Sequence, residues 1–185
     1  MEEERELVEA LRAQKPGAFE RAYALHNGRI YGFLLRLSRR RDVADDLFQE
    51  TWMRLQRHAP RLLPDTRLLP WLLTVARNLF RSHARWRVLD MSRFFEDDEA
   101  AHVPSPEGAA EVRQELATME LALGHLANGA RELLLLSAIQ ELDPTEIQAM
   151  LELSPEAYRQ RLSRARKELK DAMAKVKVPG KARNA

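Results

Sequence analysis

The stretch 71–87, WLLTVARNLFRSHARWR, predicts a helix with two different faces. At about 100° per residue, one face collects the apolar side chains of Leu72, Val75, Ala76, Leu79 and Phe80. The other side carries a row of arginines at every fourth position: Arg77, Arg81 and Arg85. Arginines in one row repel each other, and no acidic residue stands between Asp65 and Asp90 to balance them. We therefore expect this face to contact nucleic acid, although a solvated amphipathic face is the alternative.

The composition favours a helix-rich globular protein. The chain has 185 residues, of which 45% are apolar and 31% charged, enough for one large domain or two small ones. Its formal net charge is only +2, so contact with nucleic acid has to come from local basic patches. Cysteine is absent, which excludes disulfides and thiolate metal sites and fits a reducing compartment.

The sequence contains no pattern typical of a targeting or membrane-spanning segment. The first residues, MEEERELVEALRAQK, are acidic and amphipathic, unlike a signal peptide. The longest apolar run, LLLL at 133–136, is far shorter than a membrane span. We expect a cytoplasmic protein without membrane insertion.

Helical periodicity recurs along most of the chain, so we predict an all-α fold of two helical domains. The first domain, residues 1–88, has predicted helices at 2–14, 18–39 (interrupted near Asn27 and Gly28), 42–58, and from Pro70 to about Val88. Residues 89–110 are rich in acids and contain Pro104 and Pro106, which predicts an acidic flexible linker. The second domain, 111–175, has predicted helices at 111–126, 130–140, 144–151 and 155–175. A disordered basic tail is expected at 176–185.

The second domain ends in a predicted helix-turn-helix. Asp143-Pro144 and Ser154-Pro155 are both cap-plus-proline helix starts, and about three residues join the two helices. A recognition helix presents its N-terminal part to bases and its flanks to phosphates. Base contacts are expected from Glu156, Arg159, Gln160 and Ser163. Contacts mainly to the backbone are expected from Arg161, Arg164, Arg166 and Lys167. An ordinary helical hairpin with a basic outer face is the alternative.

Three blocks of the sequence together resemble the bacterial sigma-70 family of RNA polymerase subunits. They are DLFQETWMR at 46–54, WLLTVARN at 71–78 and RLSRAR at 161–166. The short length, without a third domain between the two, is similar to the extracytoplasmic-function (ECF) class. The resemblance extends over nearly the whole chain, with residues 18–88 as the second sigma domain and 115–175 as the fourth.

The resemblance implies that the first block binds core RNA polymerase. In the family, this helix docks on the clamp-helix coiled coil of the β′ subunit. Here the implied polymerase-binding arc consists of Asp42, Asp46, Gln49, Glu50 and Met53. Without the resemblance, a solvated acidic face explains the same residues. The other implied partners are the polymerase β flap, promoter DNA and an anti-sigma factor.

The resemblance also implies two contacts with promoter DNA. The helix at 71–87 would capture the minus-ten element as a single strand, with a base pocket in the loop 58–69. The implied minus-ten residues are Arg77, Asn78, Arg81, Arg85 and Trp86, although Trp86 fits the core equally well. The recognition helix would contact the minus-thirty-five element. In the linker, the acids at 96–99 suit either a channel that holds a phosphate backbone or a solvated tether.

The sequence departs from the family pattern at three places. Glu152 stands where the turn commonly has Gly, and it must adopt a positive φ if the turn geometry is kept. The recognition helix has Glu156-Ala157-Tyr158-Arg159-Gln160 where Gly-Thr-Val-Lys-Ser is common. Ser82 replaces a frequent Asp. These departures bear on promoter preference and on the strength of minus-thirty-five binding.

No catalytic residues, metal ligands or cofactor are expected. The five histidines are scattered, and the chain has no HExxH, Gly-rich phosphate loop or GxSxG motif. The leading hypothesis is an ECF-type sigma factor that directs promoter-specific initiation. The alternatives are a stand-alone helix-turn-helix regulator and a sigma-like adaptor that has lost promoter recognition. The block at 46–54 favours the first over the second, whereas Glu152 and Ala157 keep the third open.

Overall fold

A computed structural model of the chain describes residues 2–89 and 110–176, with backbone alone at 86–89 and 110–113. All regular structure in these ranges is helical, which confirms the predicted all-α class. The chain divides into two compact units, Met1–Glu99 and Ala100–Ala185. The predicted linker and the basic tail fall almost entirely outside the described residues. None of the described helices is long and apolar enough to cross a bilayer.

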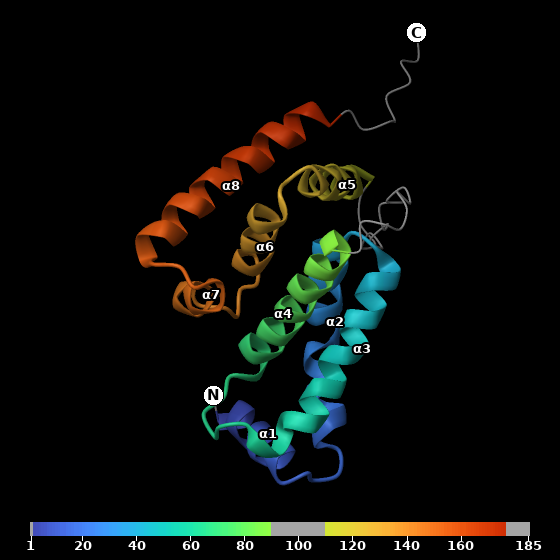
Figure 1. Cartoon of the computed structure of the whole chain (residues 1–185), viewed down its shortest axis with the longest axis vertical. Helices are drawn as coiled ribbons and strands as arrows, with labels where there is room; N and C mark the ends of the chain where they lie inside the picture. Colours follow the sequence, from blue (N-terminus) through green and yellow to red (C-terminus); the bar gives the residue numbers. More distant parts are fainter. Residues whose placement is uncertain (1, 90–109, 177–185) are drawn as a thin grey trace. The chain divides into compact units, whose positions relative to one another are not determined.

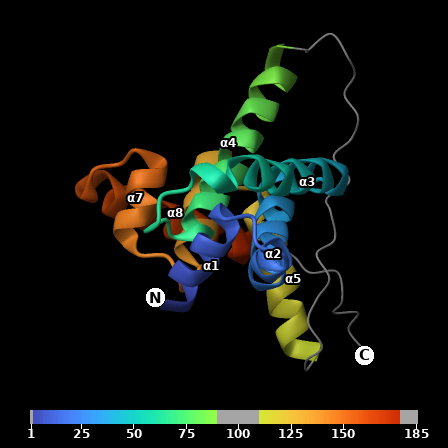
Figure 2. The ribbon, with the colours of Figure 1, turned by 90° about the horizontal axis from the view of Figure 1, so that it is seen from below.

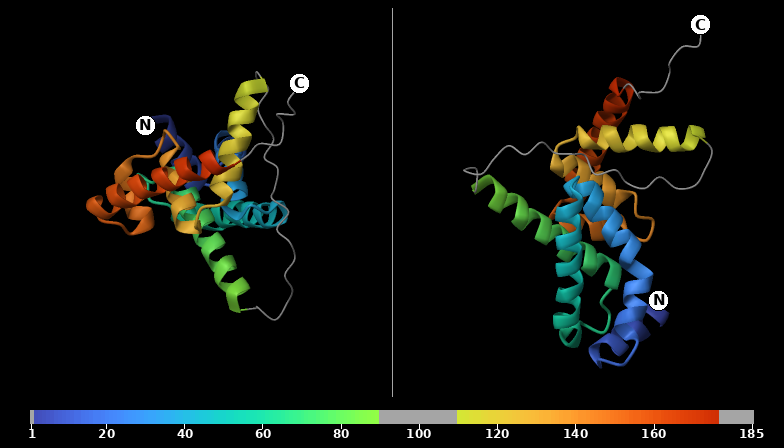
Figure 3. Two further views of the ribbon diagram at one scale, coloured as in Figure 1. Left: turned by 90° about the horizontal axis from the view of Figure 1, so that it is seen from above. Right: turned by 90° about the vertical axis from the view of Figure 1, so that its right-hand side faces the viewer.

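Three helices build the core of the first unit: α2 (Ala18–Ser38), α3 (Arg41–His58) and α4 (Leu68–Leu89). Helices α2 and α3 form a hairpin, which turns at Arg39 with a φ of 59°. Helix α4 packs against both partners, and its C-terminal part runs on beyond them (Figures 2 and 3). The fully buried side chains include Ile30, Leu34, Leu55, Leu72 and Leu73.

A short helix, α1 (Glu2–Arg12), and a 3₁₀ turn, η1 (Ala59–Arg61), close one end of this unit (Figure 1). Helix α1 packs on α2 and on η1. Its buried face consists of Leu7, Val8 and Leu11, at the spacing expected for an amphipathic helix. Helix α1 thereby supports the loop that leads into α4.

The helix predicted at 2–14 ends at Arg12, and two further predictions for this unit are wrong. Helix α2 continues through Asn27 and Gly28 without interruption, because one helical glycine costs only about 1 kcal/mol relative to alanine and the buried face resumes at Ile30. Helix α4 begins at Leu68, two residues before Pro70. A proline in the first helical turn sacrifices no hydrogen bond within the helix, so Pro70 does not have to be the first residue.

The second unit contains α5 (Ala110–Gly124), α6 (Asn128–Ser137), α7 (Pro144–Leu151) and α8 (Pro155–Lys175). The last two coincide with the predicted ranges, whereas α5 and α6 both end before the predicted residues. Helix α8 packs on α5 and α6 around a core of Leu123, Leu126, Leu134 and Ala165. This packing fixes which side of α8 is free to face a ligand.

Arg131 is a buried cation that the sequence analysis did not single out. It is only 5% exposed, and its guanidinium donates to the carbonyl oxygens of Leu123 at 2.9 Å, Gly124 at 3.1 Å and Leu126 at 2.8 Å. The first two carbonyls belong to the last turn of α5, where a helix leaves acceptors without partners in the helix, and the third follows two residues after its end. Arg131 therefore fixes the turn between α5 and α6.

Candidate polymerase and nucleic-acid interfaces

The predicted polymerase-binding residues occupy one side of α3. Asp42, Asp46 and Gln49 are exposed, and Met53 is 45% exposed. The opposite side is buried through Val43, Ala44, Leu47, Thr51 and Leu55. The predicted arc is therefore a continuous surface of polar groups around one accessible methionine.

Arginines pair with two carboxylates of this surface. Arg40 donates to Asp42, and Glu50 accepts from Arg54 Nε at 2.9 Å and from Arg57 at 2.8 Å. The bond from Arg40 lowers the pKa of Asp42, and the bond from Arg54 lowers the pKa of Glu50. Glu50 is half-buried rather than fully exposed as expected. Asp46 is exposed, and no ion pair involves it within the described residues, so its charge remains available to a partner.

A cluster of aromatic rings holds this surface in place from beneath. Trp52 packs on Phe19, Tyr23 and Phe48 with ring centroids 4.9–6.1 Å apart, distances typical of favourable edge and tilted contacts. Tyr31 packs on Phe48 and donates to Asp45 at 2.8 Å. This cluster was not predicted from the sequence, where its only signal is the concentration of aromatic residues in α2 and α3.

On α4, the expected row of three arginines is only partly exposed. Arg77 is 5% exposed and donates to Asn78 Oδ1 at 3.4 Å, so its predicted place on the outer face is wrong. Positions four residues apart shift by about 40° around a helix. Because α2 and α3 both pack on α4, the buried sector is wide enough to reach Arg77 and ends before Arg81.

The outer sector of α4 therefore consists of Asn78, Arg81 and Arg85, all exposed. Arg85 donates to Ser82 Oγ at 3.4 Å. The C-terminal part of the same helix extends beyond α2 and α3 (Figure 2). The Trp86 side chain, predicted at this surface, lies outside the described side chains.

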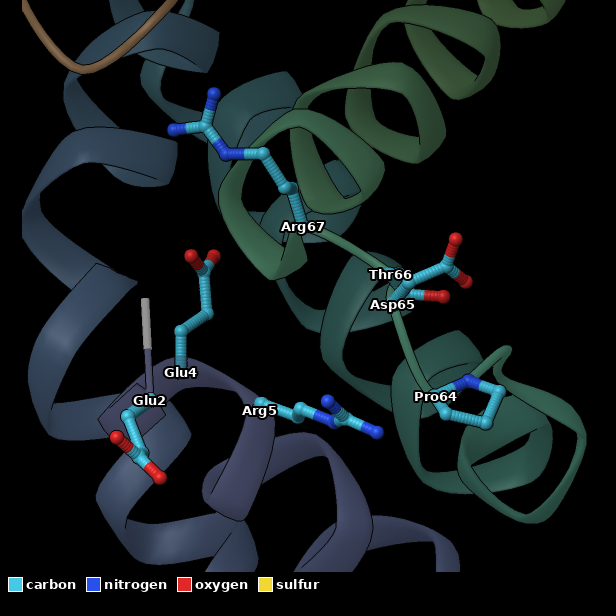
Figure 4. Close-up of a pocket in the computed structure, with 7 residues that line it drawn as sticks. All are labelled: Glu2, Glu4, Arg5, Pro64, Asp65, Thr66 and Arg67. Carbon is cyan, nitrogen blue, oxygen red and sulfur yellow. The ribbon is translucent and has the colours of Figure 1, made fainter.

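The loop before α4 borders a pocket of about 660 Å³. One wall comes from the start of α1 and the other from residues 64–67, as Figure 4 shows. Across this pocket, the Leu68 N–H donates to Glu4 Oε1 at 3.1 Å. No functional residue was predicted in α1 from the sequence.

The recognition helix α8 starts as expected. Ser154 Oγ accepts from the Ala157 N–H at 3.2 Å, which is an N-cap bond. Glu152 ends α7 with a φ of 55°, so the turn keeps the left-handed geometry that favours glycine. The predicted conflict at Glu152 is confirmed.

The predicted DNA-contacting side of α8 is exposed throughout: Glu156, Arg159, Gln160, Arg161, Ser163, Arg164, Arg166 and Lys167. Tyr158 and Ala165 face the core. The Glu156 carboxylate accepts from Gln160 Nε2 at 3.1 Å and from Arg159 at 3.4 Å. These bonds join the expected base-contacting groups of the first turns into one cluster.

Two sequence families match the two units. Residues 22–88 match Sigma-70 region 2, and residues 116–169 match Sigma-70 region 4. The chain is 32% identical to the RNA polymerase sigma factor CarQ of Myxococcus xanthus over 173 residues, 92% of this chain and 98% of that relative. It is 29% identical to the ECF RNA polymerase sigma factor SigM of Bacillus subtilis, over 80% of this chain and 90% of that relative.

Among solved structures, the sigma factor RpoE in complex with the anti-sigma factor NepR, from Bartonella quintana, is similar to this chain. Its TM-score is 0.73 at 25% identity, covering 87% of this chain and 99% of that structure. The chain belongs to the sigma-70 family of bacterial RNA polymerase sigma factors, in the ECF class. As a member it binds core RNA polymerase and promoter DNA and directs transcription initiation. Nothing in the comparisons supports a stand-alone regulator.

Proposed function

We propose that three helical faces of this sigma factor bind three different targets. The arc on α3 (Asp42, Asp46, Gln49, Glu50 and Met53) docks on the β′ clamp helices of core polymerase. The outer sector of α4 (Asn78, Arg81 and Arg85) holds the single-stranded minus-ten element, with the segment 58–69 between α3 and α4 receiving unstacked bases. The outer side of α8 binds the minus-thirty-five element, and its unit also contacts the β flap.

The observation that carries this proposal is the exposure of Asp42, Asp46, Gln49 and Met53 on α3, of the outer sector of α4 and of the predicted residues of α8, each on the side of its helix that faces away from the core. On α4 the exposed sector is basic and has no acidic neighbour in the sequence from 66 to 89. A positive groove or ridge is what single-stranded DNA requires. On α8 the exposed side combines amide, carboxylate and guanidinium groups, which can discriminate base edges, with cations for phosphates.

The proposed domain boundaries separate the helices that carry these three faces. We propose residues 1–88 as the unit for polymerase and minus-ten binding, 89–110 as a tether, and 111–175 as the minus-thirty-five unit. Polymerisation chemistry belongs to the polymerase, so this subunit needs no catalytic group or cofactor of its own. It would act in the cytoplasm, where core polymerase lies.

An anti-sigma factor is a second proposed partner. The similar RpoE structure was solved with the anti-sigma factor NepR. In this chain the exposed Tyr23 and Met53 lie on α2 and α3, on the helices that carry the polymerase-binding arc. An inhibitor bound there would compete directly with the clamp helices.

The test is promoter-specific run-off transcription with the purified protein and core polymerase. Promoters are first recovered from a random DNA pool with the wild-type holoenzyme. We expect transcripts of defined start from the recovered promoters and none from core polymerase alone. Polymerase binding without any recovered promoter would favour the adaptor hypothesis, and duplex binding without polymerase binding would favour a stand-alone regulator.

A further inference from the structure

One hydrogen bond connects the first helix of the chain to the DNA-facing helix of the same unit. Glu4 Oε1 accepts from the Leu68 N–H at 3.1 Å. Leu68 is the first residue of α4 and is fully buried. In Figure 4, Glu4 rises from α1 toward the chain segment at Arg67 that enters α4.

The start of α4 has buried backbone donors that require such an acceptor. The first N–H groups of a helix have no partner inside the helix. Pro70 has no N–H, and the Trp71 N–H already donates to the Arg67 carbonyl at 3.2 Å, so Leu68 and Leu69 carry the unpaired donors of this turn. Both residues are buried, which keeps water away from their backbone.

Glu4 is held by a helix whose position is itself fixed. Leu7, Val8 and Leu11 of α1 are buried, and α1 packs on α2 and η1. The side of α1 that bears Glu2, Glu4 and Arg5 forms one wall of the pocket, opposite residues 64–67. Helix α1 precedes the residues 22–88 that match Sigma-70 region 2, so the family match gives it no role.

We propose that Glu4 is a positioning residue for capture of the minus-ten strand. By accepting from Leu68, it fixes the first turn of α4 and the preceding residues 64–67 relative to α1. Asn78, Arg81 and Arg85 follow on the same continuous helix, so the cap fixes the first turn of the helix that carries their sector. This inference rests on the minus-ten role proposed above for α4 and its loop.

Three variants of Glu4 distinguish the effect of its side-chain length from the effect of its charge. Glu4→Ala removes the acceptor, and Glu4→Asp keeps the charge on a side chain shorter by one methylene. Glu4→Gln keeps an acceptor oxygen at the same distance but loses the charge. Glu3→Ala and Glu6→Ala are matched controls, because both residues are exposed on α1.

Each variant is assembled with core polymerase and tested with a fluorescent single strand that carries the minus-ten sequence recovered with the wild type. We expect Glu4→Ala and Glu4→Asp to bind it on the order of fivefold more weakly, the effect of losing a helix cap. Glu4→Gln and both controls should match the wild type. Affinity for core polymerase and for the minus-thirty-five duplex should not change in any variant.

Hydrogen exchange provides a second readout that does not depend on DNA. The Leu68 amide should exchange faster in Glu4→Ala and Glu4→Asp than in Glu4→Gln. Simple repulsion between Glu4 and DNA predicts the opposite pattern, with tighter binding in both Glu4→Ala and Glu4→Gln, and that result would overturn the proposal. Equal binding by the wild type, Glu4→Ala and Glu4→Asp would also overturn it while leaving the minus-ten role intact. A wild-type holoenzyme that binds no single strand would instead refute that role, and this inference with it.

Discussion

Glu156 accepts a hydrogen bond from Gln160 at 3.1 Å across one turn of the recognition helix. The same carboxylate accepts from Arg159 at 3.4 Å. Because all three side chains are exposed, Glu156 has two possible roles: direct contact with a base, or orientation of the two donors. Mutations of the donors and of the acceptor separate these roles.

Arg159→Ala or Gln160→Ala should relax the preference at individual bases of the minus-thirty-five element, by roughly 1–3 kcal/mol per lost bidentate contact. Glu156→Ala should shift the selected bases at the same positions if it orients the donors. Glu168→Ala removes the same charge further along α8 and is the control. Selection from a random duplex pool measures the outcome, and an unchanged motif for Arg159→Ala would show that Arg159 contacts no base.

Arg164→Ala and Lys167→Ala should weaken all duplex sequences evenly, because phosphates carry no sequence information. The slope of log affinity against log salt should become shallower by about 0.9 for each lost contact. Fluorescence titrations at several salt concentrations measure this slope. A change in the selected motif would contradict the assignment to phosphates.

On α4, Arg77 should behave differently from Arg81 and Arg85. Arg77 is buried, so Arg77→Ala should lower the free energy of unfolding by about 1–3 kcal/mol. The double variant Arg81→Ala/Arg85→Ala should leave stability unchanged and flatten the salt dependence of single-strand binding by about 1.4. Arg21→Ala, an exposed arginine of α2, is the control. Normal promoter opening by the double variant, probed with permanganate, would show that these arginines do not hold the strand.

Asp46→Lys should weaken binding to core polymerase without unfolding the first unit. Asp46 is exposed, and no ion pair within the described residues neutralises its charge. Fluorescence anisotropy with core polymerase measures the affinity, and Glu6→Lys on α1 is the matched charge reversal. Equal affinities for Asp46→Lys and wild type would exclude Asp46 from the interface.

The pair formed by Glu50 and Arg54 should make a small pH-dependent contribution to stability. The folded pKa of Glu50 is lowered, so the folded state binds fewer protons than the unfolded state between the two pKa values. The contribution is complete above the unfolded pKa of about 4.3 and is lost as the pH falls through the folded pKa. Glu50→Gln should cost about 0.5 kcal/mol at pH 7 and progressively less as the pH falls below the unfolded pKa, as measured by urea unfolding.

Glu152→Gly should stabilise the second unit by roughly 1 kcal/mol, because a side chain in the left-handed region costs about 1–2 kcal/mol. Glu152→Ala keeps the Cβ atom and should bring no gain. Urea midpoints compare the variants. Since the turn already has the geometry that glycine favours, the selected minus-thirty-five motif should stay the same, and a changed motif would mean that Glu152 itself contacts DNA.

Local periodicity in the sequence was sufficient to predict many of the helices of this protein and the exposed sides of two of them. The ranges of α7 and α8 and the outer sides of α3 and α8 follow from spacing, caps and prolines, all of which act within one or two turns. The exposed side of such a helix can be predicted without knowing which distant segment packs on its buried side. The three sequence blocks also sufficed to recognise the family, because their order along the chain is itself a sequence property.

Other features depend on which helices pack together. Arg77 is buried because α4 lies against both α2 and α3, and a single-helix pattern cannot reveal how wide the covered sector is. Trp52 and Tyr23 meet across two helices. Glu4 and Leu68 form a hydrogen bond although 64 positions of sequence separate them. The first turn of α4 has no acceptor of its own for the Leu68 N–H, and α1 provides one. Contacts between residues far apart in the chain come from the packing of one surface on another, so only the tertiary structure decided them.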